Sequence, residues 1–299
     1  MRRHLPGVLM FRRGGHRASG PFDTQLKTKG LKEAIQSVRQ RFPFPGYIDA
    51  TEASCINVCR AVQHWLPLPA RILDVGAGPC DKTAVLSFLG YECTACDDLE
   101  DSWHGVSGNR EHIVEFAKNS GIEYCVQRIE TNLPFRDAEF DMIILNDVLE
   151  HLHESPRDML LRLVRLLKAS GLLLITVPNA ANLRKRFRLL VGKTNLPSFE
   201  YYFWNPGPWR GHIREYVRED LELLVDYLGL EAVELRACHH MLRAMPRALR
   251  PVWVGLTFFA RNSRDTWLLV ARKGKGWLPR GKTPAEIRQI TTRFTPLEH

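Results

Sequence analysis

The chain has 299 residues, of which 44% are hydrophobic and 25% charged, a composition that excludes a disordered or fibrous protein. Its longest uncharged stretches, residues 171–183 and 251–260, are too short to cross a bilayer, so we expect no transmembrane segment, and we expect no signal peptide. The net charge of +9 comes from the two ends: residues 1–29 and 272–299 hold 14 of the 42 Lys and Arg but only 3 of the 33 acids.

We interpret residues 1–29 as a basic flexible arm and residues 272–299 as a basic C-terminal tail, whose last three residues, 297–299, resemble the remnant of an expression tag. The charge of these ends leaves two interpretations open. They are solvated tails, or they make electrostatic contact with anionic lipid or nucleic acid. The seven cysteines form no evenly spaced framework, which favours free thiols and a cytoplasmic protein.

Between the ends, residues 30–271 are predicted to form one domain that begins with two helices within residues 30–69. Apolar residues recur at helical spacing over 31–42 and 53–66, and Pro and Gly residues separate the two stretches.

Strands and helices then alternate along the chain. Seven strands are predicted, at residues 71–75, 92–96, 123–126, 140–145, 172–177, 231–235 and 267–271. Helices are predicted at residues 82–89, 113–119, 156–170 and 220–228, the third beginning after a Ser155 cap and ending at Gly171. This order predicts a doubly wound, mostly parallel seven-stranded α/β sheet, with the ligand beyond the carboxyl ends of the strands.

A glycine turn follows the first predicted strand. Residues 72–78 read Ile-Leu-Asp-Val-Gly-Ala-Gly, and Asp97 lies 19 residues after Gly78, at the end of the next strand. An acid at this distance from a glycine turn is typical of a contact to the ribose of a nucleotide-type cofactor. Because Pro79 and Cys80 replace the third glycine of the dinucleotide motif, the turn favours S-adenosylmethionine (SAM), which has no pyrophosphate, over NAD.

Residues 180–214 interrupt the alternation and are interpreted as a lid insertion above the site. The segment begins with a basic run, 184–188, and continues with aromatic residues at positions 199, 201, 202, 203, 204 and 209. Two interpretations of the aromatic residues remain open: they hold a planar or apolar acceptor, or they only pack the insertion onto the domain.

Several motifs together resemble one known family. They lie at residues 73–78, 97–98, 133–135, 140–141, 146–151, 166–171, 177–179 and 211–216. In order and spacing they closely resemble the class I SAM-dependent methyltransferases, and most of all the group that includes the quinone-biosynthesis O-methyltransferases. The resemblance covers residues 70–235.

The resemblance implies a Rossmann-like methyltransferase fold and a set of cofactor contacts. The implied contacts are Asp74, Gly76, Ala77, Gly78, Asp97, Asp98, Ile129, Glu130 and Asn146. One position departs from the family, because Arg128 stands where an acid usually faces the adenine amine. Either Glu130 replaces that acid through a longer loop, or the backbone of Ile129 binds the adenine.

The same resemblance suggests how a methyl group is transferred. A hydroxyl acceptor needs a base, and His151 is the favoured candidate, with Glu150 beside it and His212 at the far end of the lid. The other interpretation of His151 is a packing role at a helix start. Expected acceptors are a sugar or glycan, a quinone-type phenol or a natural product, small or lipid-linked.

Asp147, Glu150, His151 and His212 also resemble the magnesium-binding set of the small-RNA 2′-O-methyltransferases. A divalent metal is not favoured, because the Leu-Glu-His segment occurs widely in the superfamily without one. Two alternative functions stay open: a metal-dependent RNA 2′-O-methyltransferase, suggested by the basic ends and the 184–188 run, and a SAM-binding protein without catalysis.

Overall fold

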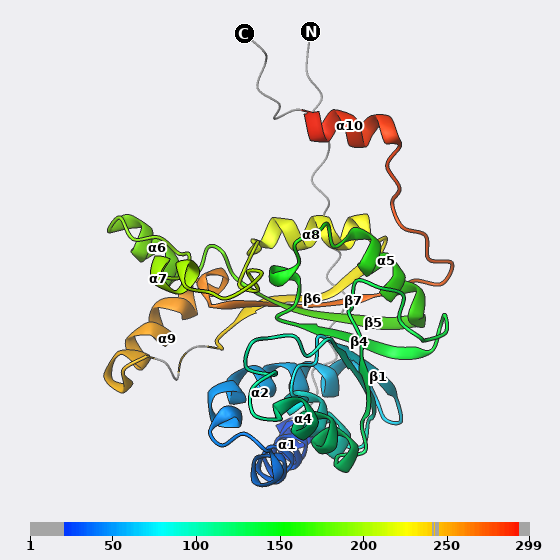
Figure 1. Ribbon diagram of the computed structural model, residues 1–299, viewed down its shortest axis with the longest axis vertical. Helices are drawn as coiled ribbons and strands as arrows, with labels where there is room; N and C mark the ends of the chain where they lie inside the picture. Colours follow the sequence, from blue (N-terminus) through cyan, green and yellow to red (C-terminus); the bar gives the residue numbers. More distant parts are fainter. Residues whose placement is uncertain (1–20, 241, 243–244, 293–299) are drawn as a thin grey trace.

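A seven-stranded sheet forms the centre of the computed structural model, which describes residues 21–292 except 241, 243 and 244, with side chains from residue 30. The strands are β1 (Arg71–Val75), β2 (Glu92–Asp97), β3 (Glu123–Val126), β4 (Phe140–Asn146), β5 (Leu167–Pro178), β6 (Glu231–Cys238) and β7 (Thr266–Arg272). Their order is β3-β2-β1-β4-β5-β7-β6, and only β7 runs antiparallel to its neighbours (Figure 1). The predicted fold class is confirmed.

The strand order places a crevice at one edge of the sheet. From β1 the chain goes outward to β2 and β3, then returns to β4 on the other side of β1. The connections that leave the carboxyl ends of β1 and β4 therefore diverge to opposite faces, and the space between them is open to a ligand.

Helices cover both faces of the sheet (Figure 1). One face carries α1 (Pro21–Arg41), α2 (Tyr47–Trp65), α3 (Asp81–Phe88) and α4 (Asn109–Asn119), and the other carries α5 (Arg157–Leu166) and α8 (Arg218–Tyr227). Each face buries its own apolar cluster, and buried strand residues alternate between the two clusters: Ile72 packs on the first side and Leu73 on the second.

The boundary between α5 and β5 differs from the prediction. Helix α5 ends at Leu166, and β5 begins at Leu167 instead of after Gly171. Leu167 pairs with Phe140 and Leu172 with Met142, so residues 168–171 bulge out of the ladder. The bulge interrupts the apolar pattern at the start of β5. The helical spacing of apolar residues over Leu160–Leu167 therefore led to the prediction that the helix continues to Gly171.

The ends of the chain also differ from expectation. Residues 1–20 and 293–299, which include most of the expected arm and the tag-like end, lie outside the described residues. Residues 21–29 belong to α1 rather than to an arm, and α10 (Pro284–Thr292) lies within the C-terminal tail.

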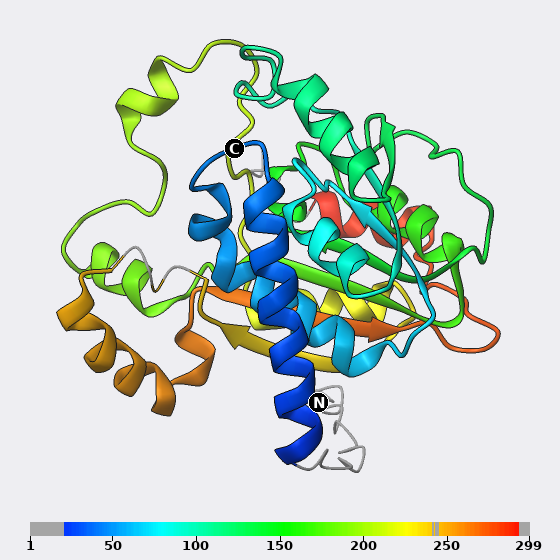
Figure 2. The ribbon, with the colours of Figure 1, turned by 90° about the horizontal axis from the view of Figure 1, so that it is seen from below.

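Two insertions extend from the strand edge that holds the crevice. Residues 180–214 contain α6 (Leu183–Leu190) and α7 (Phe199–Phe203), and the connection from β6 to β7 contains α9 (Arg250–Phe259), which the sequence analysis did not predict. In both Figure 1 and Figure 2, these three helices lie at one side of the molecule. No helix in the described part of the chain is long and apolar enough to span a membrane.

Candidate functional site

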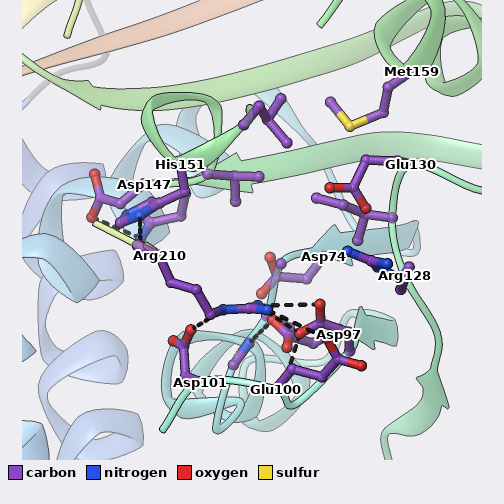
Figure 3. Close-up of a pocket in the computed structure, with 18 of the residues that line it drawn as sticks. Asp74, Asp97, Glu100, Asp101, Arg128, Glu130, Asp147, His151, Met159 and Arg210 are labelled. Carbon is purple, nitrogen blue, oxygen red and sulfur yellow. Dashed lines mark hydrogen bonds and ion pairs between the residues drawn. The ribbon is translucent and has the colours of Figure 1, made fainter. Parts of the chain in front are cut away.

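A pocket of about 1070 Å³ opens beyond the carboxyl ends of β1, β2 and β4 (Figure 3). Its wall brings together residues far apart in sequence: Gly76 from the turn after β1, Asp97 from the end of β2, Asn146 from the end of β4 and Trp209 from the lid insertion. The pocket is thus where the strand order predicts it.

The glycine turn has a conformation that other residues rarely adopt. Gly76 has a φ of 72° and Gly78 a φ of 51°. A Cβ on Gly76 would lie 2.5 Å from a methyl carbon of Val148, so even alanine cannot fit there unless the Val148 side chain moves. The turn therefore leaves bare backbone in the pocket wall.

Asp97 is held at the end of β2 by backbone donors. One carboxylate oxygen accepts from the Gly78 N–H at 2.9 Å and the other from the Leu99 N–H at 2.8 Å. Burial raises the pKa of Asp97, and these two hydrogen bonds oppose the shift. Each oxygen keeps a further acceptor site, so the carboxylate, which lines the pocket, suits a hydroxyl pair.

Asp74 has a different role, although it also lines the pocket. The Thr83 hydroxyl donates to its carboxylate at 2.5 Å, which ties β1 to α3 beneath the turn. Burial raises the pKa of Asp74 to about 6. Asp74 thus supports the glycine turn.

The remaining predicted cofactor residues also lie in the pocket wall. Ala77, Asp98, Ile129, Glu130 and Asn146 line it, and so does Arg128, at the position where the family usually has an acid. The side-chain amide of Asn146 donates to the Asp147 carboxylate at 3.1 Å. Asp147 has a φ of 56°, so the backbone turns sharply as it leaves β4.

Arg210 connects the lid insertion to the cofactor side of the pocket, and the sequence analysis missed it. Its guanidinium lies 2.9 Å from carboxylate oxygens of both Asp98 and Asp101, and 3.5 Å from Glu100 (Figure 3). The basic side chain of Arg210, in the second half of the insertion, and the acidic run 97–101 have opposite charges, and this was the only signal in the sequence.

His151 lies on a short 3₁₀ turn after β4 and faces the pocket. Its Nδ1 is 2.7 Å from the carbonyl oxygen of Arg210. Because a carbonyl only accepts, Nδ1 must carry the proton, and in the neutral ring Nε2 then carries a lone pair. Nε2 lies 3.9 Å from a carboxylate oxygen of Glu150. Burial lowers the pKa of His151, the neighbouring His212 adds to this, and the Arg210 carbonyl opposes it, so the imidazole is neutral near pH 7.

Glu150, His151 and His212 form a compact cluster, of which only His151 lines the pocket, with one ligand atom of each within 4.8 Å of the others. Glu150 is 1% exposed, and among the described residues its carboxylate oxygens have no hydrogen-bond partner. Burial, reinforced by the charge of Asp147, raises its pKa to about 9. His212 is held by Glu215, whose carboxylate lies 3.0 Å from Nδ1.

This cluster is the best candidate for a metal in the described part of the chain. Both imidazoles have Nδ1 engaged by an oxygen, an arrangement that orients Nε2 toward a cation. The fourth residue of the predicted metal set, Asp147, lies outside the cluster. Neither Glu150 nor His212 lines the pocket, so of the three predicted catalytic residues only His151 faces it.

The pocket wall also contains residues that the sequence analysis did not identify. Tyr47 and Thr51 of α2 line it, together with Trp103 from the loop after β2. Among the lid aromatics, all of which the structure describes, only Trp209 lines the pocket, and Tyr201 and Tyr202 pack edge-on against its ring. The other lid aromatics are exposed, so they do not hold an acceptor within this pocket.

Comparison with known families decides which cofactor this pocket holds. Residues 73–175 match the family model described as a methyltransferase domain, a stretch that includes the glycine turn, Asp97 and His151. The chain carries a class I SAM-dependent methyltransferase domain. SAM is its cofactor, in agreement with the prediction from the glycine turn. No curated protein matches the sequence.

Solved structures share the fold of this methyltransferase at low sequence identity. A SAM-dependent methyltransferase from Archaeoglobus fulgidus is 17% identical with a TM-score of 0.50, covering 75% of this chain and 94% of its own. A protein from Pyrococcus horikoshii OT3 is 17% identical with a TM-score of 0.51, covering 80% and 97%. The cyclase SpnF is 16% identical with a TM-score of 0.50, covering 75% and 82%. These likenesses show the fold alone, and the reaction has to be argued from the site.

Proposed function

We propose that this methyltransferase transfers the methyl group of SAM to a hydroxyl of a small or lipid-linked acceptor, with His151 as the general base. The observation that carries the proposal is the contact between Nδ1 of His151 and the Arg210 carbonyl, because it fixes the imidazole as the tautomer with a lone pair on Nε2. The pocket wall thereby holds a neutral base.

The residues of the pocket suit SAM at the positions that the family implies. Gly76 and Gly78 allow close approach of the backbone, and Asp97 offers carboxylate oxygens to the ribose hydroxyls. The backbone at Ile129 and Glu130 lines the place expected for adenine. When bound, SAM supplies an electrophilic methyl group on a sulfonium.

His151 contributes by moving one proton. As the acceptor oxygen bonds to the methyl carbon and the bond from that carbon to sulfur breaks, the hydroxyl proton passes to Nε2 of His151. The Arg210 carbonyl keeps the ring oriented throughout. Glu150, held neutral by burial, does not serve as the base near pH 7.

The direct test uses SAM with a radiolabelled methyl group and a panel of acceptors: short and lipid-tailed catechols, phenols, aliphatic alcohols and primary amines. We expect the label to appear in a hydroxyl acceptor. We also expect His151→Ala to lower the turnover rate at least about a hundredfold. His112→Ala is the matched control, because His112 is exposed on α4 and does not line the pocket. Labelling of amines alone would refute O-methylation, and full activity of His151→Ala would refute the base.

A second candidate is the same methyl transfer assisted by a divalent cation. The buried carboxylate of Glu150, without a hydrogen-bond partner among the described residues, and the two oriented imidazoles favour it. A cation bound there would be coordinated by Nε2 of His151 and would orient the acceptor oxygen in place of the base. The two candidates differ in their response to chelation.

A further inference from the structure

Helices α6, α7 and α9 leave the sheet at the edge that holds the pocket. Pro178, the last residue of β5, pairs with Thr266 at the start of β7, and Cys238 at the end of β6 pairs with the same residue. The insertions after β5 and after β6 therefore begin side by side. Figures 1 and 2 both place the three helices at one side of the molecule, beyond the sheet, and in Figure 2 α7 lies apart from α6 and α9 on that side.

These helices expose apolar side chains that nothing in the described chain covers. Leu190 of α6 is 80% exposed, Phe199 of α7 is 75% exposed and Phe259 of α9 is 89% exposed. No residue of α7 is buried, and the only buried residues of α6 and α9 are Lys185 and Thr257. We call these three helices and their exposed side chains the apolar edge. Exposed apolar surface on this scale marks an interaction site.

The apolar edge is also strongly basic. Residues 183–204 hold five Lys and Arg against one acid, Glu200, and residues 239–264 hold five Arg and no acid. Arg184, Arg186 and Arg188 are exposed on α6, and Arg261 lies over the ring of Phe258 beside α9. An anionic partner is therefore required for charge complementarity.

Three kinds of partner fit an apolar and basic surface to different degrees. A second copy of this chain, docked through the same edge, would place arginines opposite arginines. A nucleic acid would use the aromatic rings but would leave the aliphatic tips of Leu190 and Leu256 in water. An anionic bilayer fits both the apolar and the basic side chains, because the apolar side chains enter the membrane interface while the Arg side chains contact the headgroups.

We propose that the apolar edge docks on an anionic lipid bilayer, and that the pocket takes a lipid-linked acceptor from that surface. The uptake of a lipid-linked acceptor rests on the proposed function, whereas the docking on the bilayer does not. Ring contacts connect the apolar edge to the pocket. Tyr201 and Tyr202 of α7 pack on Trp209, and Trp209 lines the pocket. The helices are too short or too polar to span the bilayer, so the contact is interfacial.

Vesicle flotation of the full chain tests the docking. We expect binding to vesicles that contain phosphatidylglycerol, weaker binding as salt rises, and little binding to pure phosphatidylcholine. Leu190→Ser with Phe259→Ser, and separately Arg184→Glu with Arg247→Glu, should each reduce the bound fraction at least about fivefold.

The controls change exposed apolar and exposed basic residues elsewhere. Leu223→Ser with Leu278→Ser removes exposed leucines of α8 and the C-terminal tail, and Arg60→Glu with Arg288→Glu makes the same charge change on α2 and α10. Both controls should float like the unchanged chain. Calorimetric titration of each variant with SAM confirms that the fold and the cofactor site are intact.

Several outcomes would overturn the proposal. These are absence of flotation with phosphatidylglycerol at low salt, equal losses in the controls, and loss of a dimer rather than of vesicle binding in the Leu190 and Phe259 variant. Tight binding of RNA in place of vesicles would likewise assign the apolar edge to nucleic acid. Flotation without methyl transfer to any hydroxyl would refute the proposed function and leave docking intact.

Discussion

The carbonyl oxygen of Arg210 lies 2.7 Å from Nδ1 of His151. The guanidinium of the same arginine lies 2.9 Å from carboxylate oxygens of Asp98 and Asp101, on the cofactor side of the pocket. Arg210, a single residue of the lid insertion, therefore contacts both the proposed base and the loop after β2. Its side chain fixes where the lid loop lies, and its backbone fixes which nitrogen of His151 carries the proton.

Arg210→Ala should therefore lower kcat more than it lowers SAM affinity. Without its ion pairs the lid loop loses its attachment to the loop after β2, and the His151 ring loses a fixed acceptor. We expect turnover to fall about tenfold. Arg214→Ala is the control, since that arginine lies in the same insertion but pairs with Asp220 away from the pocket. An equal loss in both variants would mean that charge in the insertion, and not this contact, matters.

The pH dependence of kcat/KM should show an acidic limb below the ordinary histidine pKa of 6.5. Burial lowers the pKa of His151, and only the neutral ring accepts a proton, so activity falls as pH drops through that lowered value. Above it the rate should stay level until the acceptor itself titrates. A limb centred above pH 7, or one that persists in His151→Gln, would contradict the assignment.

Glu150→Gln should stabilise the protein at high pH. The pKa of Glu150 is about 9 in the folded chain against an ordinary 4.5, so between these values the folded state holds a proton that the unfolded state releases. Stability of the unchanged chain therefore falls as pH rises through this window, and glutamine removes that contribution.

Urea unfolding of both chains in EDTA measures this effect. We expect a gain on the order of 5 kcal/mol at pH 8 that shrinks toward pH 5. A difference that is independent of pH would show that the pKa of Glu150 is not raised in the folded chain.

Chelation separates the two forms of catalysis. If His151 acts as the base, activity after treatment with EDTA and desalting should be unchanged. Loss of activity that Mg²⁺, Mn²⁺ or Zn²⁺ restores would instead favour a cation held by Glu150, His151 and His212. Metal analysis of the purified chain provides a readout that does not depend on the acceptor.

Much of the fold could be predicted from local pattern. β1 and β3 have the predicted bounds, because short stretches with buried or half-buried apolar residues end there at polar or turn residues. The boundary between α5 and β5 was missed, since the bulge at residues 168–171 depends on pairing with β4. Helix α9 was missed because its apolar positions do not face a core.

The site shows the same division between local and long-range information. Gly76, Gly78 and Asp97 were identified because their spacing in one βαβ unit reports their geometry. Arg210 was not, because its contacts to Asp98 and Asp101 span more than 100 residues. An acceptor role was one of two interpretations left open for the lid aromatics; only Trp209 among them lines the pocket, and the exposed rings of α7 belong to the apolar edge.

The central claim is that the turn at Gly76 and the carboxylate of Asp97 bind SAM while His151 performs chemistry. Calorimetric titration with SAM of the unchanged chain, Asp97→Ala and His151→Ala tests it most directly. We predict one site in the unchanged chain, at least about tenfold weaker binding in a folded Asp97→Ala chain, and unchanged binding in His151→Ala. Absence of binding to the unchanged chain, or equal affinity in all three, would contradict this account.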